Sequence, residues 1–81
     1  MDGNGLRSHI DRLHTTALGA ERVRRNLGID DRDVVGFCRR LILGADCAIS
    51  RRGKNWYCAA GPVTITVNAS SFTIITAHRN G

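Results

Sequence analysis

The chain has 81 residues and a formal net charge of +5, with 42% apolar and 23% charged residues. This is an ordinary globular composition for a single domain over residues 1–81, and it excludes a disordered chain. No apolar run approaches the length of about 20 residues that spans a bilayer, and the first residues lack the apolar centre of a signal peptide. We therefore expect a cytoplasmic protein without membrane contact, with residues 1–5 as a flexible start.

Charge is distributed unevenly along the chain. All seven acidic residues lie before residue 47, and the rest of the chain has no acid but contains Arg51, Arg52, Lys54 and Arg79. A purely cationic half suits an anionic partner such as RNA, DNA or an acidic protein. A basic surface also serves solubility alone, so the charge by itself does not define a function.

Helices are predicted in the first half of the chain. Apolar residues at helical spacing indicate a short helix over Leu6–Leu13. Thr16 is a good N-cap for a second helix over Ala17–Leu27, and Gly28 is placed to end it. The core residues expected from this second helix are Leu18, Val23 and Leu27.

A third helix is predicted to begin at Asp30 and to end at Gly44. Asp33 follows Asp30 at the spacing of a capping box, which favours a helix start at this point. An apolar stripe at helical spacing runs along the segment and comprises Val34, Val35, Cys38, Leu41 and Ile42.

The second half of the chain predicts four strands. The first two, over Ala45–Ser50 and Asn55–Ala60, flank a glycine turn at residues 51–54. The last two form a hairpin between Val63 and Arg79, in which β-branched residues alternate with polar ones. This order predicts an α+β fold in which two or three N-terminal helices pack on one face of a four-stranded antiparallel β-meander and leave the other face open.

The register of the hairpin is predicted from a symmetric four-residue loop at residues 68–71. It places Val67 opposite Phe72, Ile65 opposite Ile74, and Val63 opposite Thr76. The apolar residues then share one face, and the other carries hydroxyl groups and ends in His-Arg. A slip of one residue would exchange the faces of one strand, so the turn decides this arrangement.

Three cysteines, Cys38, Cys47 and Cys58, are an odd number without the spacing of a zinc site. We expect them to be buried and reduced. The sequence also lacks a P-loop, a Rossmann glycine pattern and a Ser-His-Asp order, so we expect no cofactor and no metal.

Four blocks of the sequence together carry a family resemblance. They are LHTTALGAERVRRNLG (13–28), DVVGFCRRLI (33–42), RRGKNWY (51–57) and VTITVNASSFTIITAHR (63–79). The chain resembles the bacterial family catalogued as domain of unknown function 3781 over residues 13–79. This resemblance implies membership, and the family name carries no activity.

The predicted layout is also similar to that of the barnase, EndoU, colicin and RelE group of ribonucleases. Many proteins of that group are toxins that cut RNA without a metal, using polar and cationic side chains on one sheet face. The likeness is one of architecture, and architecture does not dictate function.

Metal-independent RNA cleavage needs a base, an acid and a cation beside the phosphate. His14 and His78 lie in the sharpest motifs and form the predicted base and acid pair, with Lys54 as the catalytic cation. A cap at a helix junction and a polar strand end are the structural alternatives for the two histidines. Substrate-binding residues predicted beside them are Arg79, Arg51, Arg52, Tyr57, Thr73 and Ser71.

Two functions follow as expectations. The first is a small ribonuclease of the toxin type, which acts on RNA by acid-base transesterification and has an acidic antitoxin as partner. The second is a non-catalytic basic module that binds nucleic acid or an acidic protein, including a phage-type inhibitor. Cleavage of RNA distinguishes the two functions, whereas a steep dependence of binding on salt supports the second.

Overall fold

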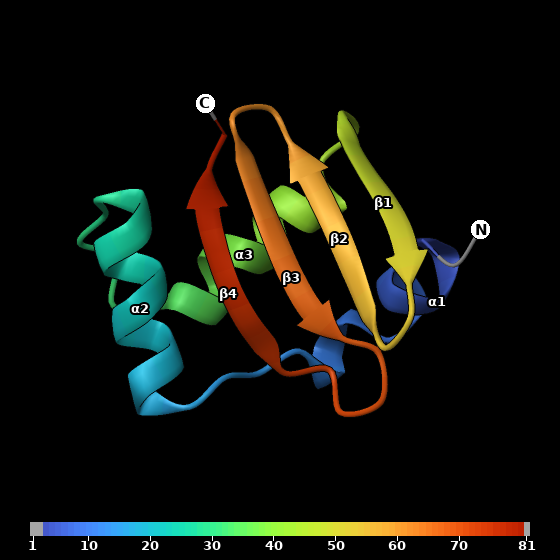
Figure 1. Cartoon of the computed structure of the whole chain (residues 1–81), viewed down its shortest axis with the longest axis horizontal. Helices are drawn as coiled ribbons and strands as arrows, with labels where there is room; N and C mark the ends of the chain where they lie inside the picture. Colours follow the sequence, from blue (N-terminus) through green and yellow to red (C-terminus); the bar gives the residue numbers. More distant parts are fainter. Residues whose placement is uncertain (1–2, 81) are drawn as a thin grey trace.

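The computed structural model describes residues 3–80. Its helical elements are α1 (Gly3–Ser8), the 3-10 helix η1 (Ile10–Arg12), α2 (Ala17–Leu27) and α3 (Val34–Leu43). Its strands are β1 (Cys47–Arg52), β2 (Asn55–Ala60), β3 (Val63–Asn68) and β4 (Ile74–Arg79). The strands form one antiparallel sheet in the order β1-β2-β3-β4, so the predicted α+β fold with a four-stranded meander is confirmed (Figure 1).

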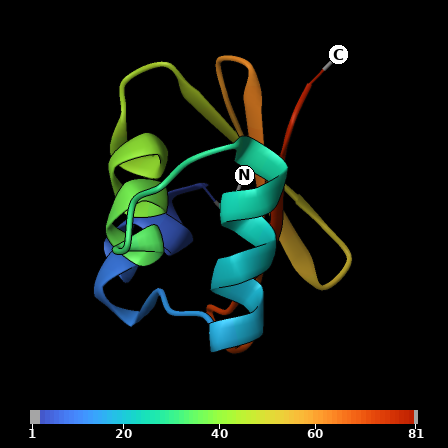
Figure 2. The ribbon, with the colours of Figure 1, turned by 90° about the vertical axis from the view of Figure 1, so that its left-hand side faces the viewer.

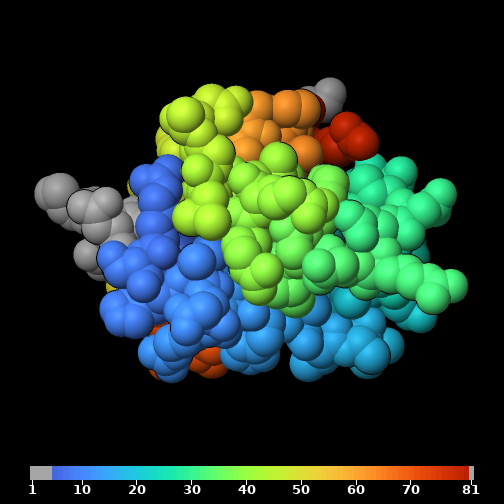
Figure 3. Space-filling model, turned by 180° about the vertical axis from the view of Figure 1, so that it is seen from behind, coloured from blue at the N-terminus to red at the C-terminus, as the bar shows by residue number. Residues whose placement is uncertain are grey.

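The helices of the described chain lie on one side of the sheet. Viewed from the edge, α1 and α3 form a layer behind the strands, and α2 runs along β4 (Figure 2). Seen from behind, the helices and their connections cover most of the strands (Figure 3). The opposite face of the sheet, which faces the viewer in Figure 1, is not covered by any helix in residues 3–80. We call it the open face.

Local hydrogen bonds define the ends of α2 and α3. The hydroxyl of Thr16 accepts from the Gly19 amide at 3.0 Å, and Gly28 ends α2 with a positive φ of 66°. Both features match the prediction, because a threonine hydroxyl can accept from an amide at a helix start and a glycine adopts a positive φ without strain. The prediction that α3 begins at Asp30 is wrong. Asp33 is its N-cap and accepts from the Gly36 amide at 2.9 Å.

Two further predictions in the helical half are corrected. The helix predicted over Leu6–Leu13 is divided into α1 and η1 at His9, whose φ and ψ of −122° and 34° are not helical. Leu18, predicted to lie in the core, is 74% exposed. The predicted flexible start overlaps α1 at residues 3–5, and Met1 and Asp2 lie outside the described residues.

The predicted register of the β3-β4 hairpin is wrong by two residues at Val67 and by three at Ile65 and Val63. Val67 pairs with Ile74, Ile65 with Ala77, and Val63 with Arg79. The loop includes Phe72, which adopts a positive φ of 62° and turns its ring against Trp56, with 5.1 Å between the ring centroids. A bulge between Thr66 and Val67 accounts for the difference between the two shifts.

The core lies between the helices and the inner face of the sheet. Leu6, Val23, Leu27 and Ile42 from the helices meet Trp56, Ile65, Val67 and Ile74 from the strands. The three cysteines are buried and free, as predicted. Burial raises the pKa of the Cys38 and Cys58 thiols to about 12 and raises the pKa of Cys47. They are uncharged packing groups at neutral pH.

Candidate functional site

The open face is lined mainly by small polar side chains, because alternate residues of each strand point away from the helices. The strand register groups them into three rows. The first row is Ala48, Ala59, Thr64 and His78, the second is Ser50, Tyr57, Thr66 and Thr76, and the third is Arg52, Asn55 and Asn68. Tyr57 is the aromatic side chain within these rows, and it lies near their centre.

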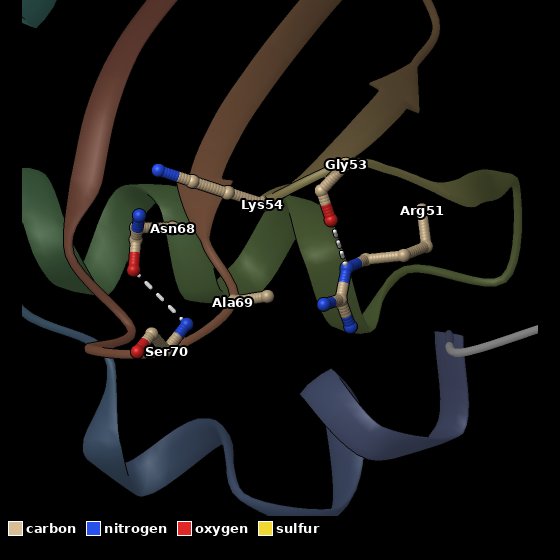
Figure 4. A pocket seen from close by; sticks show the side chains of 6 residues that line it. All are labelled: Arg51, Gly53, Lys54, Asn68, Ala69 and Ser70. Carbon is tan, nitrogen blue, oxygen red and sulfur yellow. Dashed lines mark hydrogen bonds between the residues drawn. The ribbon is translucent and has the colours of Figure 1, made fainter.

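A pocket of about 580 Å³ lies at the end of the sheet next to the third row, between the tips of two hairpins. The β1-β2 turn contributes Arg51, Gly53 and Lys54, and the β3-β4 loop contributes Asn68, Ala69 and Ser70 (Figure 4). The amide of Ala69 donates to the Lys54 carbonyl at 2.8 Å, which joins the two tips. The lining contains two cations and no acid.

The hydrogen-bond donors of this pocket are arranged by local contacts. The Asn68 side-chain oxygen accepts from the backbone amides of Ser70 and Ser71, each at 2.9 Å. The amide nitrogen of Asn68 therefore points the other way, as Figure 4 shows. The Arg51 Nε donates to the Gly53 carbonyl at 3.0 Å, and its guanidinium carbon lies 5.7 Å from the Trp56 ring centroid. Such contacts hold a guanidinium in one orientation.

His14 lies at the same end of the sheet, on the far side of β4. Its backbone forms a parallel bridge with Thr73, in which the His14 amide donates to the Phe72 carbonyl at 3.1 Å and the Ile74 amide donates to the His14 carbonyl at 2.8 Å. The ring contacts the Arg12 carbonyl through Nδ1 at 2.9 Å and the Thr73 hydroxyl through Nε2 at 3.1 Å. The Thr73 hydroxyl lies 2.7 Å from that of Ser71, and Ser71 contacts the Asn68 oxygen at 3.2 Å.

His78 lies at the other end of β4, opposite Thr64. His78 is five positions after Thr73, which corresponds to roughly 16 Å along a strand. The structure therefore does not bring His14 and His78 together, and it places Lys54 with the His14 end. A base and an acid for the same phosphate would both need to lie within hydrogen-bond reach of it.

The other predicted site residues are divided between the two faces. Tyr57 and Arg52 belong to the open face. Arg79 lies on the helical side, where its Nε and one terminal nitrogen donate to the Leu27 carbonyl at 3.0 and 2.7 Å. This contact satisfies the C-terminus of α2.

Asn68 was not among the predicted site residues, although the sequence Asn-Ala-Ser-Ser at 68–71 is a turn signal that marks its role.

These observations define a small basic α+β protein with an open polar sheet face and a cationic pocket between two hairpin tips. The chain belongs to the family described as "Protein of unknown function (DUF3781)", whose model matches residues 7–78. The family resemblance read from the sequence is thus confirmed. No curated protein and no solved structure matches the chain. Within residues 3–80, none of the helices has both the length and the apolar character needed to cross a bilayer.

Proposed function

We propose that this protein binds single-stranded RNA across the open face of its sheet, with a phosphate in the pocket and a base on Tyr57. The observation that carries the proposal is the position of a donor-rich cationic pocket at the edge of an uncovered sheet face. Phosphate contacts supply most of the affinity of such complexes, and Arg and Lys are the usual donors.

Tyr57 supports the choice of a single strand. It lies two residues from Asn55, which pairs with Asn68 of the pocket, so a nucleotide can reach both places. Unpaired bases stack on aromatic side chains of open sheets, whereas bases within a duplex are not accessible in this way. The hydroxyl of Ser50, which is exposed in the same row, offers a partner for a ribose 2′-hydroxyl, which favours RNA over DNA.

Cleavage is not part of this proposal. The separation of His14 and His78 along β4 removes the arrangement on which the acid-base expectation depended. An acidic protein is the other partner that the charge suits, and a titration with RNA distinguishes the two partners.

The test is fluorescence anisotropy with a labelled single-stranded RNA, titrated at several salt concentrations. The variant carries Arg51→Ala with Lys54→Ala, and the matched control carries Arg22→Ala with Arg25→Ala, two exposed arginines of α2. Loss of two phosphate contacts should reduce the slope of log K against log salt by about 1.4, at about 0.7 per phosphate for single strands. The control pair should change the slope much less.

Equal loss in both variants would indicate unspecific attraction by the net charge and overturn the proposal. The absence of wild-type binding to RNA would also overturn it and favour an acidic protein partner. The same samples on a denaturing gel test cleavage, because shortened RNA that depends on His14 or His78 would restore the ribonuclease hypothesis.

A further inference from the structure

The polar side chains between His14 and Asn68 form a series of contacts whose number of protons depends on the charge of His14. The Arg12 carbonyl is only an acceptor, so the His14 Nδ1 that contacts it carries a proton. Three contacts follow in series: His14 Nε2 to Thr73, Thr73 to Ser71, and Ser71 to Asn68. The Asn68 oxygen at the end is also only an acceptor, and its orientation is fixed by two backbone amides. We call this series the hydroxyl chain.

The two hydroxyl groups supply two protons for these three contacts. With a neutral imidazole, one contact therefore has two lone pairs facing each other. With an imidazolium, Nε2 donates to Thr73, Thr73 donates to Ser71, and Ser71 donates to Asn68. Every contact then has one donor and one acceptor, so the chain is complete only when His14 carries two protons.

We propose that His14 is a positioning residue for the pocket. Its protonation lets the Ser71 hydroxyl add a third hydrogen bond, through Thr73, to the two backbone amides that hold the Asn68 side chain. Asn68 lines the pocket, whereas the hydrogen bonds of the His14 ring go to Arg12 and Thr73. His14 thus acts on the pocket through the hydroxyl chain. The consequence for RNA affinity rests on the proposed function, and the consequence for the free protein does not.

The surroundings of His14 contain few other titratable groups. The 3-10 helix η1 contributes Asp11 and Arg12, and the guanidinium of Arg12 lies over the Phe72 ring at 4.4 Å. The ring of His9 also packs against Phe72, edge to face, with 6.2 Å between the two ring centroids. The first charged residue of α2 is Glu21, and the β3-β4 loop has none. We therefore assign the pH dependence of the hydroxyl chain to His14. His9 is the other histidine near Phe72, so its substitution serves as the control.

The first experiment uses the free protein. Nuclear magnetic resonance follows the side-chain amide of Asn68, the backbone amide of Ser71 and the His14 ring nitrogens between pH 5 and 8. We expect the Asn68 and Ser71 signals to shift with the midpoint of the His14 ring. In Ser71→Ala and Thr73→Val, the Asn68 side-chain signal should no longer follow that midpoint. If it follows His14 equally well in both variants, or never follows it, the proposal is wrong.

The second experiment measures RNA affinity at pH 5.5 and pH 8 for the wild type, Ser71→Ala and His9→Gln. One recovered hydrogen bond corresponds to a gain of about two- to tenfold at the lower pH. Ser71→Ala should lose this gain, while His9→Gln should keep it. Equal loss in both variants would assign the gain to net charge and overturn the positioning role. Coupled signals in the free protein without RNA binding would reject the proposed function and retain the hydroxyl chain.

Discussion

The two faces of the sheet are formed by the same strands and differ in what their side chains contact. Along β3, Ile65 and Val67 are completely buried under the helices, whereas Thr64 before them and Asn68 after them are partly exposed. Alternate residues of one strand therefore serve different purposes. Substitutions on the inner face should change the free energy of unfolding, and those on the open face should change affinity.

Thr66 is the exception on the open face, because it is only 7% exposed. It pairs with Tyr57 on one side and Thr76 on the other, and these neighbours cover it. The open face is thus closely packed around Tyr57, although no helix of the described residues lies over it. A ligand on this face would meet the outer edges of the row and the ring of Tyr57.

The largest expected effect tests the comparison on neighbouring residues. Ile65→Ala removes a side chain from the centre of the core and should lower the free energy of unfolding by about 2–5 kcal/mol. Thr64→Ala removes an exposed hydroxyl that donates to the Asn80 side chain at 2.8 Å, and it should cost about 0.5 kcal/mol or less. Urea unfolding measures both. Equal losses would show that the two faces do not divide as described.

The fold class followed from local patterns in the sequence. The order of elements, the N-cap at Thr16 and the stop at Gly28 depend on residues close together in the chain. The register of the last hairpin did not follow, because it depends on distant partners. Phe72 leaves the strand to pack on Trp56, and the segment at His14 pairs with the residues on either side of Thr73.

The candidate site was predictable in its parts and not in its assembly. The sequence identified Lys54, Arg51, Tyr57, Ser71, Thr73 and His14 as polar or cationic groups worth attention. It did not identify which of them meet, because the shifted register places Thr64 opposite His78 and the loop residues beside His14. The pairing of strands decides which side chains share an end of the sheet.

The next prediction concerns the aromatic group of the open face. Tyr57→Ala should weaken binding of single-stranded RNA by about 1–3 kcal/mol, the usual contribution of one stacked base. Tyr57→Phe keeps the ring and should retain most of the affinity. Anisotropy titrations measure both, with circular dichroism as a check on folding. Unchanged affinity in Tyr57→Ala would place the RNA elsewhere on the protein.

The inner face makes a prediction about alkaline pH. The Cys58 pKa is raised from 9.0 to about 12 by burial, so above pH 9 the unfolded chain releases a proton that the folded chain keeps. The stabilisation present below pH 9 is therefore lost as pH rises, by roughly 1 kcal/mol for this thiol at pH 10. Urea unfolding at pH 8 and pH 10 should show a smaller loss in Cys58→Ala than in the wild type. Equal losses would mean that the thiol becomes accessible to water in the folded state.

The smallest effect separates two arginines that the sequence grouped together. Arg79→Ala should lower the free energy of unfolding by about 1 kcal/mol, because the guanidinium holds the last turn of α2 through the Leu27 carbonyl. Arg52→Ala, on the open face, should leave stability nearly unchanged and weaken RNA binding. Arg79→Lys keeps the positive charge near the helix end but lacks the two-nitrogen contact, so its stability should lie between those of the wild type and Arg79→Ala. If Arg79→Ala instead reduces RNA affinity at unchanged stability, the cations of the two faces act together on the ligand, and the division between the faces does not hold at this end of β4.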